Sequence, residues 1–264
     1  PSIEDIDATP TGYLTTVLDN QGNQTATLVA SGSNRKYVTI DEIPINLQHA
    51  FVAIEDERFY DHNGIDLQGI LRAGLKGVAS GFHFSEGAST ITQQLLKNTV
   101  FTQWTSEQSM ADKFERKFQE QYLALQLEKV VDKDWILENY LNAINLGQNT
   151  LGVGVASERY FGKDVSELTL SECAVLAAIT QSPSYYNPIT HPDHNKERRQ
   201  KVLNNMLDQG YISQSEYDEA VADNVYDRIQ VVNVESQDEN INSYFVDEMT
   251  DQIVQDMIDR LGYT

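Results

Sequence analysis

Apolar residues recur at helical spacing along most of the chain from Pro44 onward, and this period restricts the possible folds more than any other feature. Two segments also begin with the Ser/Thr-x-x-Glu spacing of a capping box, at Thr169 and at Ser213. The chain is therefore predicted to be mainly α-helical. Helices are expected after Pro44, after Asp66 and near Ser89, and over 112–128, 133–145, 169–179, 193–208 and 213–222.

The first forty residues have a different pattern. Two β-prone runs, Tyr13–Leu18 and Thr25–Ala30, flank a turn sequence at 19–22 and predict a short β hairpin or arm. A last amphipathic stretch runs from about 244 to 261. The predicted organisation is an N-terminal β arm or linker over 1–40, the functional domain over 41–230 and a C-terminal linker helix over 231–264.

Composition excludes several function classes. The 264 residues include 19 lysines and arginines against 40 aspartates and glutamates, and the resulting net charge of −21 argues against nucleic-acid binding. The single cysteine, Cys173, lies in an apolar run and is expected to be a buried core thiol. One cysteine cannot form an internal disulfide or a CxxC metal site. No apolar stretch reaches the roughly 20 residues that a membrane-spanning helix needs.

The first segment that could carry chemistry is Glu55–Gly64, at the end of an apolar helix stripe. Glu55 directly follows the stripe residue Ile54, and a carboxylate at the edge of a core can serve as a general base. The alternative is a solvated helix end, because several carboxylates stand together here. His62 has no HExxH-type partner, so no metal site is predicted from it.

The second segment is Gly87–Asn98. A glycine followed by Ser89 and Thr90 at a helix start can present free backbone N–H groups to an anion. An ordinary N-cap explains Ser89 or Thr90 equally well. It does not explain a pair of glutamines, Gln93 and Gln94, on one helix with Lys97 and Asn98.

The third segment is the helix over 113–122, where Lys113, Arg116, Lys117 and Glu120 share one face. Periodicity alone favours a solvated face with an i,i+4 ion pair, although three cations on one face are notable in so acidic a chain. The opposite, largely aromatic face is predicted to point into the core; it consists of Phe114, Phe118, Tyr122 and Leu125.

The fourth segment is Tyr140–Gly147, whose aliphatic residues at helical spacing predict core packing. The glycines that follow, Gly152 and Gly154, do not form a dinucleotide-binding fingerprint, because no strand precedes them. We therefore expect no organic cofactor.

In this order the four segments resemble the peptidoglycan glycosyltransferase family, found in bifunctional class A penicillin-binding proteins and in monofunctional glycosyltransferases. The similarity runs from about Tyr37 to Ile212 and includes the loop at 181–188. The residues that carry it are Glu55-Asp-x-x-Phe59-x-x-His62-x-Gly64, Gly87-x-Ser89-Thr-Ile-Thr-Gln-Gln94, Arg116-Lys117-x-x-Glu120, and Tyr140-Leu-Asn142 followed by Gly147.

The resemblance implies a lysozyme-like helical lobe with a smaller, membrane-associated lobe. It also implies that Glu55 is the catalytic base that deprotonates the 4-hydroxyl of the acceptor sugar of lipid II. That oxygen attacks the anomeric carbon of the growing glycan strand, and undecaprenyl pyrophosphate leaves with inversion. Glu120 then resembles the second catalytic glutamate, which organises the pyrophosphate, its cations or a bound divalent metal such as Mg²⁺ or Mn²⁺. The residues that resemble the donor and pyrophosphate site are Ser89, Gln93, Gln94, Lys97, Asn98, Arg116 and Lys117.

The family relation further implies a position at the extracytoplasmic face of the bacterial cell membrane, in contact with its outer leaflet and with other cell-wall synthesis proteins. We expect the membrane anchor, and the transpeptidase domain with its SxxK, SxN and KTG motifs, to lie outside this chain. The rings of Phe82, Phe84, Phe101 and Trp104 either reach the membrane interface or fill the core. Two positions depart from the family pattern: Gln119, where some members have lysine, and Asn145, where an aromatic residue is common.

Two rival interpretations remain. A lysozyme-like hydrolase that cleaves finished glycan would use Glu55 as an acid, but it would give Lys97, Arg116 and Lys117 no pyrophosphate to bind. A non-catalytic cell-wall scaffold would bind lipid or partners through the same cleft without turnover.

Overall fold

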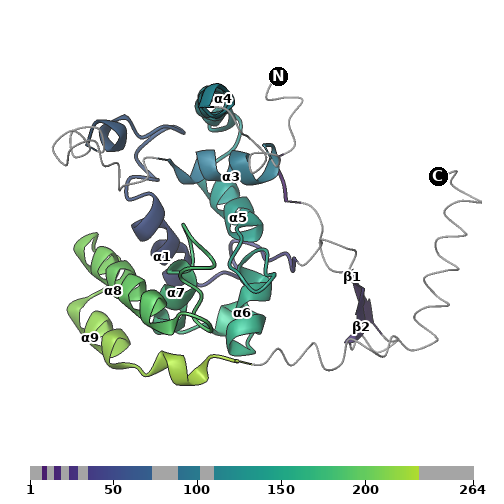
Figure 1. Cartoon of the computed structure of the whole chain (residues 1–264), viewed down its shortest axis with the longest axis vertical. Coiled ribbons are helices and arrows are strands. Elements are labelled where there is room, and N and C mark those ends of the chain that lie inside the picture. Colours follow the sequence, from purple (N-terminus) through teal and green to yellow (C-terminus); the bar gives the residue numbers. More distant parts are fainter. Residues whose placement is uncertain are drawn as a thin grey trace, which may run out of the picture.

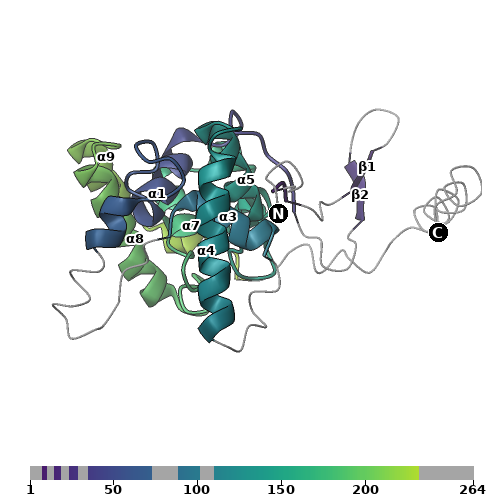
Figure 2. The same cartoon turned by 90° about the horizontal axis from the view of Figure 1, so that it is seen from above.

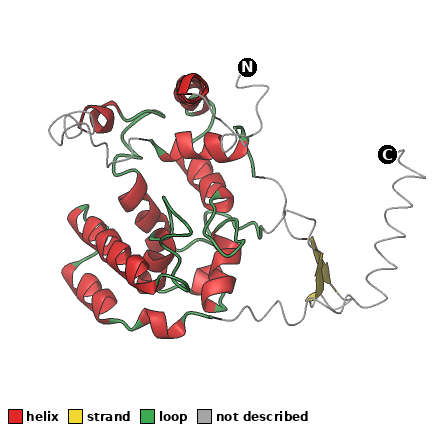
Figure 3. Cartoon of the chain, in the orientation of Figure 1, coloured by secondary structure: helices red, strands yellow, loops and turns green. Residues whose placement is uncertain are grey.

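The computed structural model describes residues 8–10, 15–18, 24–28, 35–72, 89–101 and 110–231. In this part of the chain helices dominate, and the strands β1 (Thr15–Leu18) and β2 (Gln24–Leu28) pair only with each other (Figure 3). The pairing is antiparallel, with Thr16 opposite Thr27. The mainly helical fold is confirmed and the two predicted strands do pair. The turn at 19–22 and the stretch 244–261 lie outside the described residues, and the domain bounds and the division into two lobes stay predictions.

Most of the predicted helices are present, and their ends differ from the prediction by a few residues. Threonine and serine begin α3, α7 and α9 with capping boxes, at Thr90, Thr169 and Ser213. The α-helices are α1 (Ile45–Glu55), α3 (Ile91–Thr99), α4 (Met110–Leu127), α5 (Lys133–Ala143), α6 (Val153–Phe161), α7 (Leu170–Ala177), α8 (Pro192–Asp208) and α9 (Gln214–Ala222).

The core forms around α1, which packs against α7 and α8, while α3 packs against α4 and α5 (Figures 1 and 2). Helix α7 is buried from Ser171 to Ala177 and has no exposed face. Cys173 lies in it, fully buried, and burial raises the pKa of its thiol well above the ordinary value. The prediction of a core thiol is therefore confirmed.

Helix α6 is absent from the prediction because its first turn has the sequence Gly152-Val153-Gly154, and glycine disfavours helix. The structure shows why glycine is needed. A Cβ at position 154 would lie 2.6 Å from the carbonyl oxygen of Lys36, so only glycine lets α6 pack against this extended segment.

The predicted orientation of α4 is wrong. Its apolar stripe, expected in the core, is exposed, while Glu120 on the charged face is buried. The exposed fractions are 61% for Phe114, 70% for Phe118, 59% for Tyr122 and 39% for Leu125. The helical turn at 67–72, whose N-terminal cap Asp66 accepts a hydrogen bond from the backbone N–H of Gly69 at 2.9 Å, also exposes Leu67 and Leu71.

Of the four aromatic residues considered for the membrane interface, Phe101 is half-buried and packs against the core. The other three, Phe82, Phe84 and Trp104, lie outside the described residues. Within the described ranges, no helix combines the length and the apolar character required to cross a bilayer.

Candidate active site

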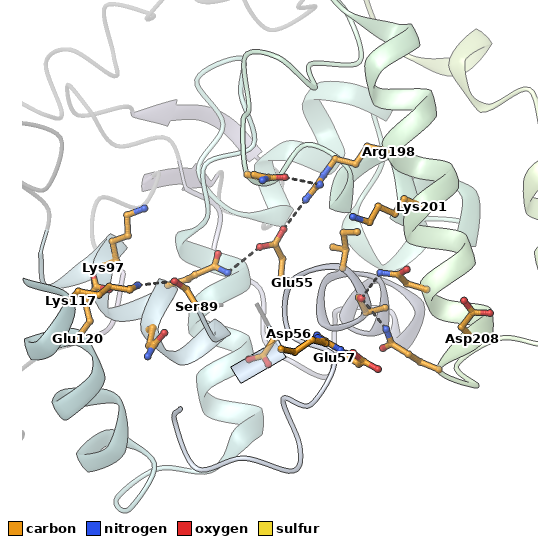
Figure 4. A pocket seen from close by; sticks show the side chains of 18 of the residues that line it. Glu55, Asp56, Glu57, Ser89, Lys97, Lys117, Glu120, Arg198, Lys201 and Asp208 are labelled. Carbon is orange, nitrogen blue, oxygen red and sulfur yellow. Dashed lines mark hydrogen bonds and ion pairs between the residues drawn. The ribbon is translucent and has the colours of Figure 1, made fainter. Parts of the chain in front are cut away.

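A cleft of about 730 Å³ lies between the end of α1, the start of α3, the inward face of α4 and one face of α8 (Figure 4). Glu55 and the charged face of α4 line the same cleft, which is the spatial arrangement that the predicted chemistry requires. Asn98 does not line it. The predicted site residues that line it are Glu55, Ser89, Gln93, Gln94, Lys97, Arg116, Lys117 and Glu120.

Glu55 is the last residue of α1, and its side chain is only 12% exposed. Its Oε2 accepts a hydrogen bond from Gln94 Nε2 at 3.0 Å, and its Oε1 accepts one from Arg198 Nη2 at 3.1 Å. The Thr180 hydroxyl lies against the same Oε1. Glu57, by contrast, has a 45% exposed side chain. The solvated helix end therefore describes Glu57 but not Glu55.

Asp56 connects the end of α1 to the start of α3 through hydrogen bonds. Its carboxylate, 2% exposed, accepts a hydrogen bond from the backbone N–H of Ile91 at 2.8 Å and contacts His62 Nε2 at 2.9 Å. His62 Nδ1 accepts the N–H of Gly64 at 3.1 Å, so the ring proton lies on Nε2 and is donated to Asp56. Asp56 and His62 thus have a structural role that fixes Glu55 relative to Gln94.

Tyr140 orients the side-chain amide of Gln94. Its hydroxyl donates to Gln94 Oε1 at 3.3 Å, which turns the amide nitrogen of Gln94 toward Glu55. Burial, followed by the nearby charges of Glu55 and Asp56, raises the pKa of the Tyr140 hydroxyl well above its ordinary value. Tyr140 therefore keeps its proton and acts as the donor.

The cations of α4 are organised by a buried carboxylate. Glu120 is fully buried and forms ion pairs with Arg116 and with Lys117 Nζ, the latter at 2.9 Å. Lys117 Nζ also donates to Ser89 Oγ at 2.7 Å. Because Glu120 holds both cations on the cleft side, they are oriented before any anion arrives. The purely solvated ion pair considered from the sequence does not fit this burial.

Four further residues that the sequence analysis singled out have structural roles or lie outside the cleft. Gln93 completes the capping box of α3, since its Oε1 accepts the N–H of Thr90 at 3.1 Å. Lys113 is exposed and does not line the cleft. Gln119 also lies outside the lining and donates to Glu115 at 3.2 Å, so its departure from the family pattern does not alter the cleft wall. Asn145 accepts the N–H of Gly147 at 2.9 Å within a turn.

A divalent cation at Glu120 stays a prediction, and the side chains around this residue do not fit one. Divalent metals such as Mg²⁺ are bound by several oxygen ligands. Glu120 instead has Arg116 and Lys117 as neighbours, which occupy its two oxygens and repel a cation. No group of three or more His, Cys, Asp or Glu side chains in the described part of the chain is arranged to hold a metal.

The sequence analysis missed Thr180 and the cleft face of α8, which presents Arg198, Lys201 and Asn205. A signal was available for Arg198: it lies four residues before Val202 and eight before Met206, in line with buried apolar residues of α8. An arginine in an apolar stripe is rarely buried without a partner. The sequence pattern could not name that partner.

Comparison with known proteins gives the family of this chain. The family described as Transglycosylase matches residues 21–207. The chain belongs to the transglycosylase family. The predicted relation to the glycosyltransferase domain of class A penicillin-binding proteins is thereby confirmed.

Members of the transglycosylase family with curated names are similar over most of this chain. Penicillin-binding protein 1A of Clostridium perfringens (strain 13 / Type A) is 40% identical over 254 residues, which cover 93% of this chain and 36% of the relative. Penicillin-binding protein 1F of Bacillus subtilis (strain 168) is 47% identical over 201 residues, 76% of this chain and 27% of the relative. The chain thus spans only about a third of these relatives.

Among solved structures, penicillin-binding protein 1A from Haemophilus influenzae matches with a TM-score of 0.46 and 24% sequence identity. This match covers 96% of the present chain and 25% of that protein.

Proposed function

We propose that this domain is a peptidoglycan glycosyltransferase that polymerises lipid II into glycan strands. Glu55 removes the proton from the 4-hydroxyl of the acceptor sugar. The hydroxyl oxygen forms a bond to the anomeric carbon of the growing strand, and the bond from that carbon to the pyrophosphate breaks. The electron pair leaves with undecaprenyl pyrophosphate, and the configuration at the anomeric carbon is inverted.

One observation carries this proposal: a nearly buried carboxylate and an organised set of cations line the same cleft. The leaving pyrophosphate gains negative charge as the bond breaks, so cations fixed in advance stabilise the transition state more than the ground state. Lys97 and Lys117 lie on one side of Glu55, while Arg198 and Lys201 lie on the other (Figure 4). We assign the donor pyrophosphate to the first side and the acceptor to the side of α8.

A glycan hydrolase and a non-catalytic scaffold make different predictions from a glycosyltransferase. The test is to incubate the protein with lipid II and, separately, with finished glycan strands, and to analyse the products by gel electrophoresis and mass spectrometry. Polymer from lipid II supports the proposal. Cleavage of finished glycan would support the hydrolase, and saturable binding of lipid II without any product would support the scaffold.

The donor assignment predicts that Lys117→Ala weakens the binding of a diphosphate-linked lipid by about 10- to 100-fold, because a hydrogen bond to a charged group is lost. Lys113→Ala is the matched control, since Lys113 lies one turn earlier on α4 but does not line the cleft. Its dissociation constant is expected to stay within about twofold of wild type. Fluorescence titration with a phosphoglycolipid that mimics the growing strand measures both, and equal effects of the two variants would refute the assignment.

We further propose that the domain contacts the outer leaflet of the cell membrane, at its extracytoplasmic face. The support is the exposed apolar stripe of α4, which stands next to a cleft whose substrate keeps its lipid chain in the bilayer. Four large apolar side chains on one helix face form an area that water solvates poorly. Contacts with other cell-wall synthesis proteins stay a prediction.

This membrane contact predicts that Phe118→Ser reduces co-sedimentation with phosphatidylcholine vesicles by about tenfold or more, since the variant has no phenylalanine ring to insert into the lipid. Val130→Ser is the control, because Val130 is 62% exposed but lies beyond the end of α4. An equal loss in both variants, or in neither, would speak against a membrane-facing α4.

A further inference from the structure

Arg198 reaches the carboxylate of Glu55 from α8 and is itself held on several sides. Its Nη1 donates to Gln181 Oε1 at 2.9 Å, and its guanidinium carbon lies 4.9 Å from the centre of the Tyr186 ring. Its Nη2 lies 3.1 Å from Glu55 Oε1 and 3.2 Å from Thr180 Oγ1. The side chain is only 9% exposed. The guanidinium plane is therefore fixed in one orientation.

The acceptor capacity of Glu55 shows what this contact does. A carboxylate offers about four lone-pair positions, two on each oxygen. Arg198 and Thr180 both lie on Oε1, whereas among the described residues Oε2 accepts a hydrogen bond from Gln94 alone. Thr180 has one hydroxyl hydrogen, which can go to Glu55 or to the carbonyl oxygen of Ala177 at 2.9 Å, and the charged carboxylate is the stronger acceptor. With respect to the described part of the chain, one lone pair therefore remains available, on Oε2.

We propose that Arg198 is a positioning residue for the glycosyl transfer: with Thr180 it occupies Oε1 of Glu55 and so directs the remaining basic lone pair, on Oε2, toward the acceptor hydroxyl. This inference rests on the proposed function. Arg198 acts through Glu55 and touches no reacting atom.

The adjacent arginine provides a matched control. Arg199 is also buried, on the same helix, but it points to the other side, where it donates to Ser171 Oγ at 2.7 Å and to the carbonyl oxygen of Ala220. It does not line the cleft. Replacing Arg199 therefore disturbs α8 packing without changing the orientation of Glu55.

The experiment compares lipid II polymerisation by wild type, Arg198→Ala, Arg198→Lys and Arg199→Ala, at a temperature where circular dichroism shows all four folded. Arg198→Ala is expected to lower kcat about 10- to 100-fold with KM within about twofold, because the base is misdirected. Arg198→Lys should recover part of kcat, and millimolar guanidinium ion should restore part of the activity of Arg198→Ala. Arg199→Ala should keep kcat within about twofold.

A double-variant comparison and a direct readout complete the test. If Arg198 acts through Glu55, then Arg198→Ala adds no further loss in the Glu55→Gln background. In protein labelled with ¹³C-glutamate, the Glu55 carboxyl signal, assigned by its loss in Glu55→Gln, should broaden or move in Arg198→Ala and stay unchanged in Arg199→Ala.

The inference would be overturned if the activity losses of the two single variants multiplied in the double variant. It would also be overturned by an unchanged Glu55 carboxyl signal in Arg198→Ala. The NMR readout does not require turnover. Absence of polymer from the wild type would thus refute the proposed function, while the Glu55 signal separately decides whether Arg198 orients this carboxylate.

Discussion

Glu55→Gln is expected to lower the rate of lipid II polymerisation by about 10²- to 10⁴-fold, the usual contribution of a well-placed general base. An amide has nearly the shape of the carboxylate but cannot accept the proton of the acceptor hydroxyl. Glu55 is the last residue of α1, so the helix should persist, although the lost ion pair with Arg198 should lower the melting temperature. Initial rates with labelled lipid II measure the loss of activity. Thermal unfolding of the wild type and of Glu55→Gln shows whether the fold persists.

The matched control is Glu57→Gln. Glu57 is two residues further along, its side chain is 45% exposed, and it pairs with Arg72 at 3.0 Å. Its replacement should leave the rate within about twofold. If Glu55→Gln retained wild-type activity, Glu55 would not be the base, and the mechanism proposed here would have to be abandoned.

Glu120→Gln is expected to lower both stability and activity. The variant leaves Arg116 and Lys117 beside a fully buried neutral side chain, and breaking a buried ion pair by removing one partner costs several kcal/mol. We expect a loss of about 3 kcal/mol in the free energy of unfolding, at the low end of that range because Lys117 is 39% exposed and can regain water. Polymerisation should fall as well, since the two cations lose their common anchor.

Urea denaturation measures this loss as a lower midpoint at an unchanged slope. Glu115→Gln is the control: Glu115 is exposed on the same helix, and surface substitutions of this kind usually change stability by less than about 0.5 kcal/mol. An unfolding free energy for Glu120→Gln equal to that of wild type would mean that the cations are held without Glu120.

Local interactions explain most of what could be predicted from the sequence. The capping boxes at Thr169 and Ser213 involve partners three residues apart, and helix α5 begins at the predicted residue, Lys133. The position of Glu55 directly after an apolar stripe likewise placed it at the edge of the core. Such features depend on neighbours within one or two helical turns, so a linear pattern records them.

The orientation of α4 is a feature that the sequence pattern could not predict. Periodicity correctly separated a charged face from an aromatic face, but it assigned the aromatic face to the core. The structure turns Glu120 inward and exposes Phe118, because the buried apolar contacts of α4 come from Leu123, Ala124 and Leu127 instead. Hydrophobicity alone predicts the opposite orientation.

The sequence by itself determined the helical class, most helix starts and the buried thiol at Cys173, and it singled out Glu55, Arg116, Lys117 and Glu120, which line one cleft. Only the tertiary structure decided the face that α4 presents, the helix at Gly154 and the contact of Arg198 with Glu55. The last of these joins residues 143 positions apart, and the packing of α6 depends on the backbone at Lys36. Contacts of that separation arise from how helices pack, which no local period encodes.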